Sequence, residues 1–318
     1  KKSLQCKHFD VLYTWVNGSD PQWIKERMAT EMRLGIPYQG IWRYRDVMGL
    51  KYSLRSIKKH LPWARRIFVV TAQQYPTWFN QTMDDFDTGV KFIFHDQLFH
   101  NKSHLPTYSS SSIEANFWNL PDTVSDCFIY LNDDIFFSSD IRQDDLYRID
   151  TGQALHFTGW KAPVRLELQQ TNPYHASHAY TNGLLDKMWG IETRNYFAHG
   201  ALLLNKRILS LIRDTFSKEL DNDSASPFRS KSMFVLQFVY VHFVSRFIES
   251  YTGRQDFNYY GEIRDWPNHM ERLTKDIIQK RPKCVCLNDG LQENFNQTVL
   301  TTLEHMFETL FPDKQSWE

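Results

Sequence analysis

The sequence contains no hydrophobic run of the roughly 20 residues that a membrane-spanning helix needs. Its most apolar stretch, residues 233–247, is interrupted by Gln237, His242 and Arg246, so we expect a buried helix there. No secretory signal peptide is recognisable either. The chain starts at Lys1 without a methionine, which leaves room for a membrane anchor outside this sequence.

An excess charge of one sign is also lacking. Lys and Arg together number 37, as do Asp and Glu, so the formal net charge is zero. No overall field therefore attracts nucleic acid or an acidic membrane surface, and we expect no nucleic-acid partner. Any polyanionic substrate must be bound by local charges.

Three common catalytic motifs are missing. The sequence has no Walker A loop and no Gly-x-Gly-x-x-Gly fingerprint, which disfavours a P-loop ATPase and a dinucleotide oxidoreductase. It also has no Gly-x-Ser-x-Gly elbow. Chemistry that begins with a serine nucleophile therefore has little support.

Cysteine is scarce, with four residues: Cys6, Cys127, Cys284 and Cys286. Cys127 opens an apolar strand and is expected to be an inert core thiol. We expect a disulfide between Cys6 and either Cys284 or Cys286. The Cys-Val-Cys pair is not a zinc knuckle, because no second Cys/His pair lies nearby.

Asn-X-Ser/Thr sequons, in contrast, are more frequent than chance would give. This excess favours the lumen of the secretory pathway, and we expect the Golgi. The acceptor asparagines are Asn17, Asn80, Asn101, Asn222 and Asn296.

The most informative segment is FIYLNDDIFF at residues 128–137. An apolar strand stops at Asn-Asp-Asp and then resumes. A carboxylate in an apolar setting must be paired, metal-bound or protonated, and ligands bind at the carboxyl ends of strands in open α/β sheets. We therefore predict that the carboxylates of Asp133 and Asp134 bind a divalent cation, which bridges them to a phosphate-bearing substrate. The alternative is an ordinary turn that only caps the strand.

Apolar β-branched runs alternate with helical spacing in the first half of the chain. The order β, α, β, β, α, β indicates a doubly wound α/β lobe, which we assign to residues 1–160. The expected strands are 10–15, 66–71, 90–95 and 128–131, and the expected helices are 23–34, 45–60 and 109–119.

The second half has a different pattern. One more strand is expected at 155–160, and residues 161–193 resemble a polar, substrate-facing insertion. We expect 161–318 to form a largely helical region that completes the catalytic cleft, so that the chain is one integrated catalytic unit. The expected helices are 201–216, 231–249, 265–283 and 294–310.

The loop after the first strand is a candidate nucleotide site, since α/β folds place nucleotides there. Trp15 is expected to stack on a base, and Gly18 to let the backbone of Val16 and Asn17 approach the ligand closely. An ordinary Asn-Gly turn is the alternative. Arg45 and Arg55, near one helix, suit a diphosphate; the alternative is a solvated helix face.

Three further residues stand next to predicted helix starts. Glu114 follows a run of serines and is a candidate capping-box acid. His199 precedes a helix whose N-terminus can hold an anion, although a lone histidine is usually structural. Arg229 precedes the next helix in the same way. Two basic groups at two helix starts match what a phosphoryl group requires.

In order along the chain, these segments resemble the four conserved regions of the Stealth family. That family includes the catalytic α/β subunits of N-acetylglucosamine-1-phosphotransferase and bacterial capsular polysaccharide hexose-1-phosphotransferases. The resemblance covers nearly the whole chain. It is carried by DVLYTWVNGSDP (10–21), YRDVMGLKYSLRSIKKHLPWARRIFVVT (44–71), HLPTYSSSSIEA (104–115), FIYLNDDIFF, YFAHGALLLNKRIL (196–209), FRSKSM (228–233), CVCLNDG (284–290) and FPDKQSWE (311–318).

The resemblance implies a nucleotide-sugar-transferase-like (GT-A-like) core. It also implies transfer of a sugar-1-phosphate, GlcNAc-1-phosphate above all, from a UDP-sugar donor to an acceptor sugar hydroxyl, with release of UMP. The family's functional positions fall on Glu114, Asp134, His199 and Arg229. Only residues 22–43 separate the first two regions, where animal lysosomal members carry long recognition modules, so we expect a minimal unit that acts on a mannose of a glycan. We also consider a homodimer.

The mechanism follows from these assignments. Asp134, with Asp133, is expected to hold Mg²⁺ or Mn²⁺ on the donor diphosphate, and Arg229 to neutralise charge on the transferred phosphoryl group. Either His199 or Glu114 would deprotonate the acceptor, and a near-neutral pKa favours the histidine. Two alternatives remain: a metal-dependent glycosyltransferase that releases UDP, and a non-catalytic sugar-binding module using the aromatic-rich residues 160–189.

Overall fold

A parallel sheet forms the centre of the computed structural model, which describes residues 1–38, 40, 42–86, 89–164 and 172–318. Within these residues the main sheet has five strands in the order β10-β4-β1-β2-β3. Neighbouring strands are parallel except β10, which runs antiparallel to β4. The strands are β1 (Phe9–Thr14), β2 (Ile67–Thr71), β3 (Val90–Phe94), β4 (Cys127–Asn132) and β10 (Leu202–Asn205).

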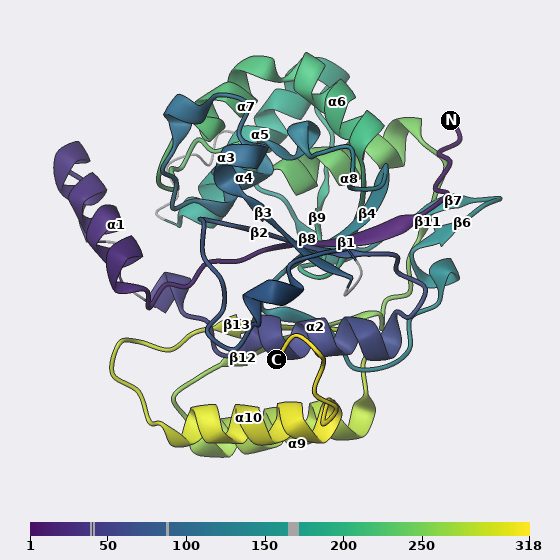
Figure 1. Ribbon diagram of the computed structural model, residues 1–318. Coiled ribbons are helices and arrows are strands. Elements are labelled where there is room, and N and C mark those ends of the chain that lie inside the picture. The colour runs from purple at the N-terminus through teal and green to yellow at the C-terminus, as the bar shows by residue number, and fades with distance from the viewer. Residues whose placement is uncertain (39, 41, 87–88, 165–171) are drawn as a thin grey trace.

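Helices cover both faces of this sheet (Figure 1). One layer contains α3 (His95–Leu98), α4 (Ser110–Glu114), α5 (Pro173–Trp189), α6 (Lys206–Thr215), α7 (Ser217–Ser224) and α8 (Leu236–Phe247). On the opposite side lie α2 (Gly49–His60), α9 (Pro267–Lys280) and α10 (Thr298–Leu310). Helix α1 (Pro21–Leu34) projects from the side of the molecule.

A second sheet meets the main one at the Asn-Asp-Asp turn. Strand β5 (Ile135–Phe137) follows that turn and pairs antiparallel with β13 (Cys284–Asp289), which pairs in parallel with β12 (Asn258–Ile263). The backbone N–H of Leu287 donates to the carbonyl of Asp134 at 2.9 Å. The acidic turn is therefore fixed between two sheets.

The remaining elements are short. A small sheet contains β6 (Tyr147–Arg148), β7 (Gly152–Leu155) and β11 (Ser250–Thr252), and a ribbon contains β8 (Phe157–Lys161) and β9 (Asn195–Phe197). Single 3-10 turns are η1 (Trp42–Tyr44), η2 (Gln81–Met83), η3 (Lys102–His104), η4 (Phe117–Asn119) and η5 (Gln143–Asp145). Within the described ranges, no helix is both long and apolar enough to cross a membrane.

The expected α/β class is confirmed, while several boundaries in the second half are wrong. Residues 202–205 form strand β10 rather than the start of a helix, because three leucines pair with the apolar β4. The helix expected at 231–249 begins only at Leu236, and strands β12 and β13 were not predicted. The segment expected as a polar insertion contains α5, which buries small residues such as Ala176 and Ala179.

Part of that segment, residues 165–171, lies outside the described residues. Strands from the two proposed halves pair with each other, β4 with β10 and β5 with β13. The division at residue 160 stays a prediction.

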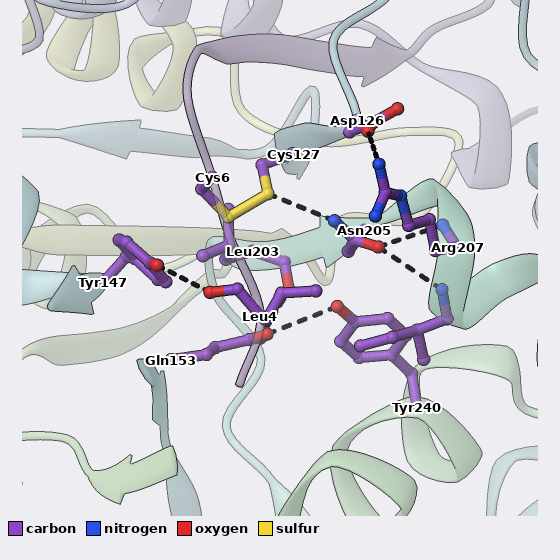
Figure 2. The surroundings of a disulfide bond; sticks show 11 residues. Leu4, Cys6, Asp126, Cys127, Tyr147, Gln153, Leu203, Asn205, Arg207 and Tyr240 are labelled. Atoms are coloured by element: carbon purple, nitrogen blue, oxygen red, sulfur yellow. Dashed lines mark hydrogen bonds and ion pairs between the residues drawn. A yellow bond between two sulfur atoms is a disulfide. The ribbon is translucent and has the colours of Figure 1, made fainter. Parts of the chain in front are cut away.

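The disulfide joins Cys6 to Cys127, with a Cα–Cα distance of 5.6 Å (Figure 2). The expected pairing of Cys6 with Cys284 or Cys286 is therefore wrong, and Cys127 is not a free thiol. The reason is strand register: Phe9 on β1 is the partner of Cys127 on β4, so the chain before β1 passes beside the start of β4. Cys284 and Cys286 lie on β13 in the other sheet and are free and buried.

Candidate active site

Asp134 lies in the turn between β4 and β5 and has an unused carboxylate oxygen. Its Oδ1 is buried and has no hydrogen-bond partner among the described residues. Its Oδ2 accepts a hydrogen bond from the Cys286 thiol at 3.5 Å. A buried carboxylate oxygen without a partner is costly, and a bound cation would remove that cost.

His199 and Cys286 complete a compact group with Asp134. His199 Nδ1 lies 3.1 Å from Cys286 Sγ, and one potential ligand atom from each of the three residues lies within 4.8 Å of the others. Gly200 allows the histidine loop to approach β12, because a Cβ there would stand 2.1 Å from Asn258 Oδ1. A carboxylate, an imidazole and a thiol are all metal ligands.

Two more carboxylates crowd this site. Asp46 accepts hydrogen bonds from Trp15 Nε1 and the Gly49 N–H, both at 2.9 Å. Burial, followed by the charges of Asp46 and Asp134, raises the pKa of Asp133 well above its usual value. A divalent cation would relieve this repulsion. The crowded carboxylates and the unpartnered Oδ1 therefore fit a metal ion.

Glu114 closes α4 and is buried against β4. The Tyr130 hydroxyl donates to Glu114 Oε1 at 2.8 Å. Burial raises the pKa of Glu114 to about 7, although hydrogen bonds from Tyr130 and Gln237 and the charge of Arg229 oppose this rise. A carboxyl group with a pKa near neutrality suits acid–base catalysis.

Arg229 is exposed beside the other end of α4. Its Nη2 donates to Ser110 Oγ at 2.9 Å. The preceding Phe228 is buried and stacks on Tyr108 with ring centroids 5.1 Å apart. The loop therefore holds Arg229 next to the helix that carries Glu114.

Tyr130 joins this pair to the acidic turn. Burial and the charges of Glu114 and Asp133 all raise the pKa of Tyr130. Its hydroxyl lies 3.0 Å from Thr14 Oγ1 at the end of β1. Thr14 Oγ1 in turn donates to Asn132 Oδ1 at 3.5 Å, at the start of the Asn-Asp-Asp turn. The structure thus groups Asp134 with His199 and Cys286, and hydrogen bonds through Tyr130 and Thr14 connect the turn to Glu114.

In the predicted nucleotide loop, the stacking of Trp15 on a base is wrong, while the close approach of the Val16 and Asn17 backbone to a ligand stays a prediction. Trp15 is 4% exposed and packs in the main core, so its ring offers no stacking surface; its indole N–H instead holds Asp46. Gly18 is needed because a Cβ would stand 2.0 Å from the Tyr44 carbonyl. The backbone of Asn17 pairs with the Gln74 side chain, and Val16 packs against the cluster of Trp23, Tyr108 and Phe228.

The two arginines expected at a diphosphate both form ion pairs within the protein. Arg45 pairs with Asp289 at 3.2 Å and donates to the Gln292 carbonyl at 2.8 Å. Arg55 is 2% exposed and donates to Glu318 and to the Phe311 carbonyl, each at 2.7 Å. Arg55 therefore anchors the C-terminal residues, and its guanidinium is buried away from any diphosphate, whereas a diphosphate contact of Arg45 stays a prediction.

Sequence reasoning missed Asp46, Tyr130 and Cys286. One available signal was the second Asn-Asp pair, Asn288-Asp289, which ends an apolar run as the first pair does. That repetition indicated a second strand end, and Cys286 lies on that strand.

Comparison with known proteins gives one consistent family. Models described as Stealth protein conserved regions 1, 2, 3 and 4 match residues 7–35, 43–155, 198–246 and 275–318. The chain is 30% identical over 224 residues to an exopolysaccharide phosphotransferase of Streptomyces coelicolor, covering 69% of this chain and 23% of that protein. It is 29% identical over 297 residues to the capsular polysaccharide phosphotransferase fcs1 of Haemophilus influenzae, covering 90% and 79%.

Solved structures give weaker matches. A galactosyltransferase, LgtC, crystallised with donor and acceptor sugar analogues, aligns with a TM-score of 0.42 at 11% identity, covering 97% of this chain and 98% of that one. The bifunctional glycosyltransferase WbbM aligns with a TM-score of 0.49 at 12% identity, covering 99% and 52%.

Proposed function

The chain belongs to the Stealth family, and from this premise we propose that it is a phosphotransferase. It would move a sugar-1-phosphate, GlcNAc-1-phosphate above all, from a UDP-sugar to the hydroxyl of an acceptor sugar such as a mannose of a glycan, and release UMP. The relatives named above are polysaccharide phosphotransferases. The observation that carries the proposal is the hydrogen-bonded link from Glu114 through Tyr130 and Thr14 to Asn132 of the acidic turn.

The first half of the proposed site orients the donor. Asp134 and His199 are its candidate metal ligands, with Asp133 beside them. A bound divalent cation such as Mg²⁺ or Mn²⁺ would supply positive charge for the donor diphosphate. Because His199 Nδ1 faces Cys286 in this group, we favour a role for the histidine in holding the metal over a role as the base.

The second half of the proposed site performs the transfer. The acceptor oxygen attacks the β-phosphorus, its proton passes to the carboxylate of Glu114, and the bond from phosphorus to UMP breaks with its electron pair leaving on UMP. Glu114 is favoured as the base because its pKa of about 7 matches that task. The guanidinium of Arg229 would neutralise charge on the phosphoryl oxygens. The bond from the sugar C1 to oxygen stays intact, so the donor's anomeric configuration persists.

We propose that this reaction takes place in the lumen of the secretory pathway, in the Golgi. Two observations support the proposal. The Cys6–Cys127 disulfide suits an oxidising compartment. Of the five sequon asparagines, four are exposed: Asn80, Asn101, Asn222 and Asn296.

Product analysis tests the proposed reaction. The protein is incubated with UDP-GlcNAc, a mannoside and Mg²⁺ or Mn²⁺, and the products are identified by mass. We expect UMP and a phosphodiester in equal amounts. UDP as the stoichiometric product would overturn phosphotransfer in favour of a glycosyltransferase. Asp134→Ala should abolish turnover, while Asp122→Asn, a change at an exposed acid, should not. Unchanged turnover in Asp134→Ala and His199→Ala would contradict the assigned site.

A further inference from the structure

We propose that Cys286 is a thiolate ligand of the cation, alongside Asp134 and His199, and that this site therefore prefers Mn²⁺, Co²⁺ or Zn²⁺ over Mg²⁺. The inference rests on the proposed metal site at Asp134. It adds Cys286 to the two aspartates that the sequence predicted as ligands, and it favours Mn²⁺ over Mg²⁺ among the two ions that were expected.

Strand pairing brings the thiol to the acidic turn. Cys286 on β13 is the register partner of Ile135 on β5, the residue directly after Asp134. The thiol is 1% exposed, and it lies 3.1 Å from His199 Nδ1 and 3.5 Å from Asp134 Oδ2. These contacts come from three segments that are distant in sequence, so the group depends on the tertiary fold.

The distances match those between atoms that share one ion. Metal–sulfur bonds are about 2.3 Å and metal–nitrogen or metal–oxygen bonds about 2.0–2.2 Å, so tetrahedral ligand atoms lie roughly 3–4 Å apart. The contacts of the thiol fall in this range, and the three ligand atoms all lie within 4.8 Å of one another. The unpartnered Asp134 Oδ1 is one further oxygen of the same group.

The chemistry of the donor atoms selects the ion. Mg²⁺ requires oxygen ligands in near-ideal octahedral geometry and keeps several waters. Thiolate and imidazole favour softer first-row ions, and Co²⁺ and Zn²⁺ bind such sites more tightly than Mn²⁺. One oxygen, one nitrogen and one sulfur donor therefore disfavour Mg²⁺.

Cys284 provides a matched control. It lies two residues earlier on the same strand and is equally buried, 1% exposed. Its sulfur accepts a hydrogen bond from the Ala201 N–H at 3.3 Å and is not part of the ligand group. Because Cys6 and Cys127 form the disulfide, Cys284 and Cys286 are the two thiols of the chain.

The test is a Co²⁺ titration followed by absorption, with the disulfide intact and no substrate present. The wild type and Cys284→Ser should show a sulfur-to-cobalt charge-transfer band in the near ultraviolet, and Cys286→Ser should not. Cys286→Ser should also weaken Co²⁺ binding by more than the roughly 10- to 100-fold cost of losing an outer-shell partner. Persistence of the band in Cys286→Ser, its loss in Cys284→Ser, or cobalt binding to the wild type without a band would each overturn the proposal.

Cadmium NMR of the wild type tests the same ligand without any variant that must fold. The cadmium chemical shift distinguishes a site with a sulfur ligand from one with oxygen and nitrogen ligands alone. A shift typical of oxygen and nitrogen alone would overturn thiolate ligation. UMP release is measured separately. UMP release without a sulfur signal would support phosphotransfer and contradict the thiolate ligand. A sulfur signal without UMP release would support the thiolate ligand and contradict phosphotransfer.

Discussion

The phenol of Tyr130 donates a hydrogen bond to the buried carboxyl of Glu114 over 2.8 Å. Tyr130 lies on β4, two residues before the turn that carries Asp133 and Asp134. The strand that leads into the proposed metal-binding turn thus also carries the phenol that lowers the pKa of the proposed base. The proposed base and the proposed metal site are therefore connected through one strand of the sheet.

Glu114→Gln should lower turnover by roughly 10²- to 10⁴-fold, because the amide cannot accept the acceptor's proton. In the wild type, kcat/KM should rise with pH through about 7, the pKa of Glu114, because only the ionised carboxylate can act as the base. This rise should be absent from the residual activity of the variant. Initial rates across pH test this, with Glu304→Gln at an exposed site as the control. A variant that keeps the same pH profile would exclude Glu114 as the base.

Tyr130→Phe should move the rise in the pH–rate profile to higher pH, since the lost hydrogen bond lowers the pKa of Glu114 in the wild type. Tyr13→Phe is a matched control: Tyr13 is buried on the neighbouring strand, with its hydroxyl 2.7 Å from Ser53. Each change should cost about 1 kcal/mol of stability. If both variants shift the pH–rate profile equally, the shift comes from a general loss of stability in the sheet and not from the hydrogen bond to Glu114.

Arg229→Ala should reduce kcat by roughly 10²- to 10³-fold, the usual cost of removing one stabilising donor from a transition state. Because Arg229 is exposed, its removal should change the free energy of unfolding by no more than about 0.5 kcal/mol. Steady-state kinetics and urea unfolding measure the two quantities. Arg207→Ala removes an exposed arginine that pairs with Asp126 (Figure 2) and should leave kcat intact.

Gly49→Ala should disturb the metal site, because a Cβ at this position would stand 2.3 Å from the Asp133 carbonyl. We expect a loss of roughly 1–3 kcal/mol in stability and weaker metal binding, measured by urea unfolding and calorimetry. Gly159→Ala is the control, since a Cβ there meets nothing within 4 Å. Equal behaviour of the two variants would show that the turn can move away without cost.

The double variant Cys6→Ser/Cys127→Ser should lose about 4–5 kcal/mol of stability, because the disulfide spans a sequence separation of 121 residues and long loops give the largest entropic effect. Urea unfolding of the oxidised wild type and the variant measures this difference. Reduced wild type should match the variant. Equal stability of the oxidised protein and the variant would mean that the unfolded chain is already compact.

The sequence was sufficient to predict the features that depend on local pattern. The Asn-Asp-Asp strand end, the serine run before Glu114 and the loop before His199 are each visible in a few neighbouring residues. The parallel strands were predictable because their apolar runs are continuous. The short run at 202–205 was not, since apolar periodicity cannot separate a short strand from the start of a helix.

Features that depend on long-range register could not be predicted. Cys286 reaches the site only because β13 pairs with β5, and Cys6 reaches Cys127 only because β1 lies beside β4. The burial of Arg55 beneath Glu318 likewise depends on where the C-terminal residues pack. Local sequence carries no information about such pairings.

The acidic turn is shared by two sheets, and this has a mechanical consequence. His199 precedes a strand of the main sheet, Cys286 lies on the second sheet, and Asp134 stands where the two meet. An ion bound by all three residues would cross-link the two sheets. At a free ion concentration of 100 times the Kd, binding would add about 2.7 kcal/mol to the free energy of unfolding. A protein that has lost its metal would therefore lose this contribution, and its two sheets would be held together less firmly.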